Sequence, residues 1–500
     1  MRRRPGNWAR TLCAAAILGG ALLGPQASAG ARPMVAAVPP TPGDVPKETT
    51  DLADRPAPPS PTELKVECGS EFGLKPGGVP RDEPLSQKVL DLPSAWQANT
   101  TATNRGAGQT IAVIDTGVSR HPRIDVQPGG DYVSGSDGTE DCDGHGTVVA
   151  GIIAAKPSAD DALVGVAPDA TILSIRQLSE RYQAKDQNGG EKAPGSMSKQ
   201  GYGPSSTLAA AVVRAVNLKA AIINISAAAC TSADSSTGDD ALGAAVRYAY
   251  ERGVVVIAAA GNVDSGNGCN VQNTEQSNPA ASWKSLSTIA SPAWFSPYVL
   301  SVGWIGPDGT PSERSLHGPW VGVAAIGQDV LGFDSKTGGM VNTQGYDDKN
   351  KKWVGIQGTS FAAPYVAGLA ALVRADHPEW DADPGTRARK IMNQIILTAH
   401  QPGTGRDDRV GAGMIDPVAA LTTHFSDDVL TSVSPVLPNH TGSDTPVAFP
   451  TPQKPAGPPH LPRLVATIGT IVCLSALGIG LAVSIPFRRR RRDDELPDFD

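Results

Sequence analysis

The chain has 500 residues, of which 40% are hydrophobic, so it is long enough for one large globular domain with additional segments. Charged residues make up 19% of it and the net charge is −7, which excludes a disordered polyanion and a basic nucleic-acid-binding protein as descriptions of the whole chain. The 43 prolines are concentrated in two segments, and this predicts a compact body between two extended flanks.

The N-terminus has the pattern of a signal peptide. Arginines precede an apolar core, TLCAAAILGGALLG, and the small residues Ala27, Ser28 and Ala29 follow at a position suited to cleavage. We predict a signal peptide at residues 1–29, with an uncleaved anchor as the alternative. Residues 30–62 contain nine prolines and few large apolar residues. We therefore expect residues 30–62 to be extended rather than a folded prodomain, within a Pro-rich N-terminal extension at 30–90.

From Asp91 onward, segments with the pattern of a strand alternate with segments that have the pattern of a helix. Strands are expected at 110–115, 170–177, 221–226 and 254–262, and helices at 145–155, 206–220, 240–253 and 360–377. Alternation of helices with continuously apolar strands predicts a mostly parallel α/β sheet with helices on both faces. The polar stretch between Gln177 and Ser205 is expected to be a long surface loop.

The C-terminal part has the pattern of a membrane anchor. We predict a Pro-rich linker at 426–463 and a transmembrane helix at 464–485. The 22 uncharged residues of that helix span about 33 Å, and a hydrocarbon core is about 30 Å thick. Five arginines follow at 488–492, and positive residues favour the cytoplasmic side. We thus expect a cytoplasmic tail at 486–500 and a single-pass type I protein of the cell membrane.

Three short motifs carry the residue types of a catalytic triad. They are DTG at 115–117, HGT at 145–147 and GTSFAAP at 358–364. Asp115 ends an expected strand, whereas His145 and Ser360 begin expected helices. A serine needs an adjacent imidazole to accept its proton, and that imidazole needs a carboxylate to fix its tautomer and to stabilise its charged form. The order Asp, His, Ser predicts a serine peptidase of the subtilisin arrangement.

Asn262 is expected to assist this triad. It follows a buried strand in the sequence AAAGN, where its amide can donate to an oxyanion together with the Ser360 backbone N–H. Isolated residues of these types more often serve as turn residues or helix caps, but four of them in this order favour catalysis. The substrate is expected to lie as an added strand against small residues. These are Ser226, Ala227, Ala228, Ala258, Ala259 and Gly261.

The chain resembles the subtilases over residues 91–422. GHGTVVAGIIAA, VVVIAAAGN and GTSFAAPYVAGLAAL are similar to that family's histidine, oxyanion and serine blocks. The Cys68 extension, the segments 290–305, 315–320 and 411–421, and the C-terminal anchor more narrowly resemble the mycosins. These are membrane-anchored proteases of actinobacterial type VII secretion systems. The resemblance implies a subtilisin-like fold, a catalytic domain at 91–425 and a retained N-terminal extension that wraps around the body.

The sequence departs from the subtilase pattern at two places. Residues 321–327, VGVAAIG, lack the proline that usually precedes the glycine, so we expect a loop of different shape there. Residues 227–229 are three alanines beside the expected substrate strand, which leaves the substrate preference open.

Four cysteines lie in the exported part of the chain, where an oxidising compartment allows three pairings. The strands at 221–226 and 254–262 are consecutive and expected to be parallel, so their C-terminal ends emerge at the same edge. Cys230 and Cys269 follow those ends, and we expect them to pair, which leaves Cys68 for Cys142. The second bond agrees with the wrapped extension that the mycosin resemblance implies.

We predict a membrane-anchored, extracytoplasmic serine endopeptidase that cleaves protein substrates and is associated with type VII secretion. No cofactor, metal or nucleic acid is expected: Asp141 and Asp143 are interpreted as loop carboxylates, and the histidines other than His145, such as His317, as surface residues. One alternative is a structural subunit that stabilises a secretion complex, and another is a housekeeping surface subtilase. Secretion that survives Ser360→Ala but not deletion of the chain favours the first alternative. A genome neighbourhood without secretion ATPases favours the second.

Overall fold

The computed structural model describes residues 41–98, 105–185, 201–264, 269–275, 279–403 and 405–432, and a few residues between 470 and 479. The signal peptide predicted at 1–29, most of the helix predicted at 464–485 and the tail at 486–500 lie outside these residues. Within the part that the structure describes, no helix is both long enough and apolar enough to cross a membrane. The described residues up to 432 belong to one compact unit, called the body below.

A seven-stranded sheet forms the centre of the body, and every neighbouring pair of its strands is parallel. The strand order is β11-β10-β8-β6-β2-β4-β3. The strands are β2 Thr110–Asp115, β3 Asp125–Asp131, β4 Thr171–Arg176, β6 Ile222–Ile225, β8 Val255–Ala259, β10 Val299–Ile305 and β11 Val321–Ile326. The parallel sheet expected from the sequence is thus confirmed.

Successive residues of each strand pack on opposite faces of this sheet. Ile111 and Val113 of β2 belong to one apolar cluster, whereas Ala112 and Ile114 belong to another. Because both faces are covered, the strands are apolar at consecutive positions instead of alternating with polar residues.

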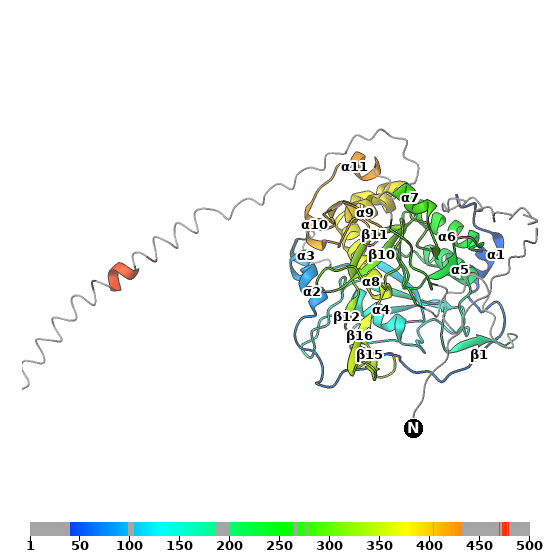
Figure 1. The fold of residues 1–500 in the computed structure, drawn as a ribbon, viewed down its shortest axis with the longest axis horizontal. Helices are drawn as coiled ribbons and strands as arrows, with labels where there is room; N and C mark the ends of the chain where they lie inside the picture. Colours follow the sequence, from blue (N-terminus) through cyan, green and yellow to red (C-terminus); the bar gives the residue numbers. More distant parts are fainter. Residues whose placement is uncertain are drawn as a thin grey trace, which may run out of the picture. The chain divides into compact units, whose positions relative to one another are not determined.

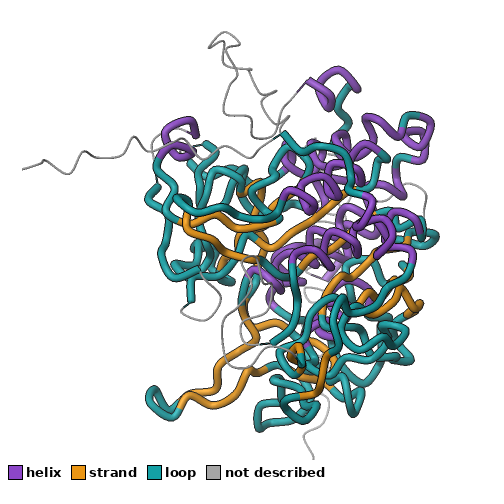
Figure 2. Tube along the Cα trace, turned by 90° about the vertical axis from the view of Figure 1, so that its right-hand side faces the viewer, coloured by secondary structure: helices purple, strands orange, loops and turns teal. Residues whose placement is uncertain are grey.

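Helices cover both faces of the sheet. The first cluster is built with α4 His145–Ala154, α8 Thr359–Asp376 and α9 Pro384–Thr398, and the second with α5 Ser205–Asn217 and α6 Asp240–Glu251. Helices α5 and α6 lie side by side (Figure 1). Most helices gather in the upper half of the body, and long loops with short strands occupy much of the lower half (Figure 2).

Shorter elements complete the body. Strands β7 Ala229–Ser232 and β9 Thr288–Ser291 pair with each other, as do β13 Gly332–Phe333 and β14 Met340–Val341. A three-stranded antiparallel sheet comprises β12 Gln328–Val330, β15 Thr343–Asp347 and β16 Lys352–Gln357. Other helices of the body are α2 Leu85–Leu90, α3 Leu92–Ala98, α7 Pro279–Lys284, α10 Pro417–Thr422 and the 3-10 helix η1 Pro378–Ala382.

The N-terminal extension is more ordered than its prolines suggested. Helix α1, Lys47–Asp54, forms between Pro46 and Pro56 and packs against α5. Strand β1, Thr62–Leu64, pairs with β5, Tyr182–Ala184. The prediction of a purely extended segment was wrong here, because the eight residues of α1 contain no proline and can form a helix.

Three further expectations need correction. Part of the stretch after Gln177 is strand β5 rather than loop, and residues 186–200 lie outside the described part. Residues 321–326 form strand β11 instead of a loop. Helix α11, Asp427–Ser432, occupies the start of the predicted linker and is held against the body by Leu430, which is buried.

Both expected disulfides are present. Cys68 joins Cys142 with a Cα–Cα distance of 4.7 Å, and Cys230 joins Cys269 with a Cα–Cα distance of 5.0 Å. The second bond follows from the adjacent parallel strands β6 and β8, as the sequence predicted. The first bond attaches the N-terminal extension to the loop that precedes α4.

Candidate active site

Strand β2 carries Asp115 at its C-terminal end. Its neighbours in the sheet are β4 and β6, and the Asp115 side chain is fully buried. The backbone carbonyl of Asp115 accepts a hydrogen bond of 2.8 Å from the Gln177 amide. Position and burial together fix this carboxylate at the edge of the sheet where α/β proteins place functional groups.

His145 is the first residue of α4 and contacts Asp115 directly. Its Nδ1 lies 2.7 Å from Asp115 Oδ1, which also accepts a 2.7 Å hydrogen bond from the Thr116 amide. A Cβ on Gly146 would lie 2.0 Å from the Gly117 carbonyl oxygen. A glycine is therefore needed at the second position of the HGT motif to let α4 approach β2 this closely.

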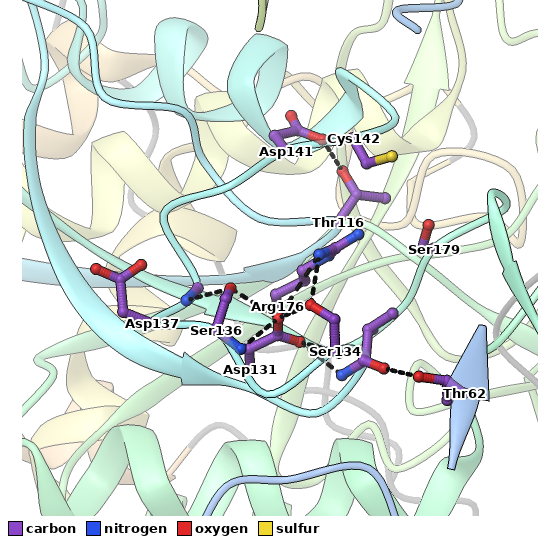
Figure 3. A network of polar contacts seen from close by, with 12 residues as sticks. Thr62, Thr116, Asp131, Ser134, Ser136, Asp137, Asp141, Cys142, Arg176 and Ser179 are labelled. Atoms are coloured by element: carbon purple, nitrogen blue, oxygen red, sulfur yellow. Dashed lines mark hydrogen bonds and ion pairs between the residues drawn. The ribbon is translucent and has the colours of Figure 1, made fainter. Parts of the chain in front are cut away.

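The loop before α4 is tied to β2 by buried hydrogen bonds. Thr116 donates its hydroxyl to Asp141 over 2.8 Å and accepts a 2.9 Å bond from the Gly146 amide. The second carboxylate oxygen of Asp141 accepts bonds from the amide and hydroxyl of Thr147. Figure 3 shows Thr116 pointing toward Asp141. These bonds set the position of His145 relative to Asp115.

A second polar network lies beside this loop and involves β3 and β4. Arg176 of β4 is buried, with Nη1 3.6 Å from Asp131 of β3 and 3.2 Å from the Ser134 hydroxyl (Figure 3). Asp131 also accepts bonds from the hydroxyl groups of Ser134 and Ser136. Thr62 of the extension donates to the Val133 carbonyl nearby. The network stabilises the first part of the loop between β3 and α4, and Cys142, which is bonded to Cys68, lies later in the same loop.

Opposing effects act on the pKa of His145. Burial lowers the pKa, whereas the negative charge of Asp115 and its hydrogen bond raise it, with smaller contributions from Asp141 and Glu71. The net result is a pKa raised above the usual value of 6.5. The imidazole is thereby suited to accept a proton and hold it next to a carboxylate.

Ser360 and Asn262 approach the same place from other elements. Ser360 is the second residue of α8, and Asn262 follows strand β8. The side-chain oxygen of Asn262, Oδ1, accepts a 3.0 Å hydrogen bond from the Thr359 backbone amide. The side-chain nitrogen of Asn262 therefore remains as the donor. Gly358, with φ +141°, lies against Asn262: a Cβ there would be 3.4 Å from both polar atoms of the Asn262 amide.

One pocket brings these side chains together. It has a volume of about 410 Å³ and is lined by Asp115, His145, Asn262 and Ser360. Five of the six expected substrate-contacting residues also line it, namely Ser226, Ala227, Ala228, Ala259 and Gly261. The sixth, Ala258, packs in the apolar cluster beneath α5 and α6, because alternation along β8 turns it away from the pocket.

Several residues that line this pocket were not predicted from the sequence. Val66, Glu71 and Phe72 come from the N-terminal extension, and Gln344 and Gln357 come from β15 and β16. The Phe72 ring is centred 6.5 Å from the His145 ring. The only signal in the sequence was Cys68, because its bond to Cys142 places the following residues beside the loop that leads to His145.

Two interpretations of polar residues are refined by the structure. Asp141 and Asp143 are loop carboxylates as expected, but both are buried, and burial raises the pKa of Asp143 to about 6. No cluster of three or more potential metal ligands occurs among the described residues. His317 was expected at the surface, yet it is 3% exposed, because its backbone amide and carbonyl bond to Gln272 and Asn273.

Comparison with known proteins identifies the family. The subtilase family model matches residues 106–413 of the chain. Mycosin-1 of Mycobacterium tuberculosis is 44% identical over 401 residues, which cover 78% of this chain and 84% of that protein. Mycosin-4 of the same organism is 42% identical and covers 86% of this chain and 87% of its own length. The chain is a subtilase of the mycosin group.

Solved structures agree with this membership. A solved structure of the serine protease MycP1, an essential component of the type VII (ESX-1) secretion system, is 40% identical. It covers 78% of this mycosin and 98% of that chain with a TM-score of 0.65. A chain in an intact ESX-5 inner membrane complex is 35% identical, covers 89% of this mycosin and 100% of that chain, and has a TM-score of 0.67. The mycosin thus has the subtilisin-like α/β fold and is a serine protease.

Proposed function

We propose that this mycosin is a serine endopeptidase whose triad is Asp115, His145 and Ser360. The observation that carries the proposal is the 2.7 Å contact between His145 Nδ1 and Asp115 Oδ1 at a pocket that Ser360 also lines. With Nδ1 bonded to the carboxylate, the other ring nitrogen is free to accept the proton of the serine hydroxyl. Geometry and the raised pKa of His145 support the same assignment.

The reaction begins when the Ser360 oxygen attacks the scissile carbonyl carbon and His145 takes the hydroxyl proton. The tetrahedral intermediate carries a negative oxygen, and the Asn262 amide and the Ser360 backbone N–H donate to it. His145 then gives its proton to the leaving amine, and water hydrolyses the acyl-enzyme by the same route. Asp115 stays ionised throughout and stabilises the imidazolium.

The substrate is a polypeptide that binds in extended form against the segments at 226–228 and 259–261. Small side chains at these positions leave room for backbone hydrogen bonds and for a modest side chain next to the scissile bond. We keep the assignment of Ser226, Ala227, Ala228, Ala259 and Gly261 to this role and drop Ala258.

The protein is further proposed to be anchored in the cell membrane by residues 464–485, with its body outside the cytoplasm, and to act within a type VII secretion complex. The apolar segment followed by five arginines supports the anchor. The signal peptide and the domain boundaries predicted from the sequence belong to this proposal. The likeness to a chain of the ESX-5 inner membrane complex supports the secretion role and also keeps a structural contribution to such a complex as the second candidate function.

Steady-state peptidase assays on the full-length protein test the main proposal. Wild-type protein should cleave a mixture of unfolded peptides, and Ser360→Ala should reduce turnover by at least about 10³-fold. Asn262→Ala should lower kcat by about 10²-fold with little effect on KM, because its donor acts on the transition state. Comparable turnover by Ser360→Ala would overturn the assignment. Secretion by cells that carry only Ser360→Ala would favour the structural role.

A further inference from the structure

A pair of aromatic side chains projects from the hairpin of β15 and β16, at the lower edge of the body in Figure 1. Tyr346 and Trp353 are direct cross-strand partners, and their rings meet edge to face with centroids 5.3 Å apart. They are 45% and 41% exposed, respectively. Cross-strand aromatic pairs stabilise sheets, and Tyr and Trp are enriched at binding hot spots.

The pair lies on the side of the hairpin that forms the pocket wall. Along β16, Ile356 points into the apolar core, and Gln357 lines the pocket. Because side chains alternate along a strand, Trp353 shares the side of Gln357, four positions away. Tyr346 lies opposite Trp353. Gln344, which also lines the pocket, is the extra residue of a β-bulge between Thr343 and Gly345, and it is exposed like Tyr346. The aromatic pair therefore continues the wall of the pocket outward along the hairpin.

The hairpin is held in shape before any ligand binds. Asp347 accepts hydrogen bonds from the amides of Lys349 and Asn350 and from the Asn350 side chain, which fixes the turn. The two rings restrict each other by their contact. Little conformational entropy is then lost when a ligand covers them, and this favours their use as a contact point.

We propose that Tyr346 and Trp353 form a second contact for the polypeptide substrate and hold an apolar side chain several residues away from the scissile bond. This proposal rests on the endopeptidase function proposed above. The occupant is the substrate because the pair is continuous with the pocket in which the scissile peptide lies. The turn carries the exposed lysines 349, 351 and 352 against two aspartates, so substrate residues beside the apolar one should be neutral or acidic.

The test uses full-length protein in detergent micelles and a library of unfolded peptides of at least 12 residues, with cleavage sites determined by mass spectrometry. Wild-type protein should enrich apolar residues at one fixed distance from the cleaved bond. The double variant Tyr346→Ala/Trp353→Ala should lose this preference but keep the preference next to the bond. For one enriched peptide, the KM of the double variant should rise about tenfold with kcat unchanged. For a version of that peptide truncated before the apolar residue, the double variant and the wild type should not differ.

Matched variants separate the loss of the aromatic contact from the general effect of removing exposed apolar side chains. Tyr346→Phe/Trp353→Phe should behave as wild type, because the rings are retained. Leu218→Ala removes another exposed apolar side chain, 41% exposed at the end of α5, and should change nothing. Each variant is also labelled with a serine-directed phosphonate, which reports an intact site whatever the peptide. An unchanged preference and KM in a double variant that labels normally would overturn the aromatic contact alone. Absence of labelling and cleavage in the wild type would overturn the endopeptidase function itself.

Discussion

Thr116 donates its hydroxyl to Asp141 over 2.8 Å, and this bond joins the strand that carries Asp115 to the loop that leads to His145. The two residues are 2% and 6% exposed, so water does not compete for the bond. The contact between His145 and Asp115 therefore depends on a carboxylate that does not itself face the substrate.

Replacing Asp141 tests this dependence. Its two oxygens accept bonds from Thr116, from the amides of Asp143 and Gly144, and from Thr147. Asp141→Asn turns one acceptor into a donor that faces other donors, so we expect the free energy of unfolding to fall by about 2–4 kcal/mol. The value of kcat should fall as well, because His145 is less firmly placed. Urea unfolding and peptidase assays measure the two effects. Asp137→Asn, which changes an exposed carboxylate of the same loop, is the control, and equal losses in both variants would contradict the account.

The pH dependence of activity should reflect the raised pKa of His145. The base must be neutral to accept a proton, so kcat/KM should rise with pH through a midpoint above 6.5. Glu71 stabilises the imidazolium by its negative charge, and Glu71→Gln should therefore move the midpoint to lower pH with little change in the plateau. Glu67→Gln changes a neighbouring exposed carboxylate as the control. A midpoint that moves upward in Glu71→Gln, or moves equally in both variants, would rule out this electrostatic role.

The sequence predicted the centre of the molecule better than its periphery. Asp115, His145 and Ser360 begin or end elements with strong apolar patterns, so their places in the fold followed from those patterns. Hairpin residues such as Tyr346 and Trp353 lie in a polar stretch without a strand pattern, and only long-range packing fixes their position. His317 is buried by hydrogen bonds from segments distant in sequence, which no local pattern signals.

The two disulfides should contribute to stability to similar extents but to activity unequally. Each should add about 2–4 kcal/mol, and the Cys68–Cys142 bond closes the longer loop, with a separation of 74 residues against 39. Cys68→Ser/Cys142→Ser should also lower kcat, because the bond holds the segment that carries Phe72, whose ring packs near His145. Cys230→Ser/Cys269→Ser is the matched comparison. Thermal unfolding measures the effect on stability, and peptidase assays measure the effect on activity. Non-reducing peptide maps that link Cys68 to Cys230 would contradict the pairing.

The proposed topology has a direct test in intact cells. Protease added outside should cut the linker at 433–463 and release a soluble, active body, because this Pro-rich segment is expected to be extended. An epitope placed after Asp500 should stay protected until the membrane is opened. Loss of the epitope with retention of the body would show the opposite orientation.

Labelling of the full-length protein with a serine-directed phosphonate, followed by peptide mass spectrometry, tests the central claim most directly. We expect one label per chain on Ser360, and His145→Ala should abolish it because the imidazole is needed to activate the hydroxyl. Stoichiometric labelling of a different residue, or full labelling of Ser360 in His145→Ala, would contradict the assignment of Asp115, His145 and Ser360 as the catalytic triad.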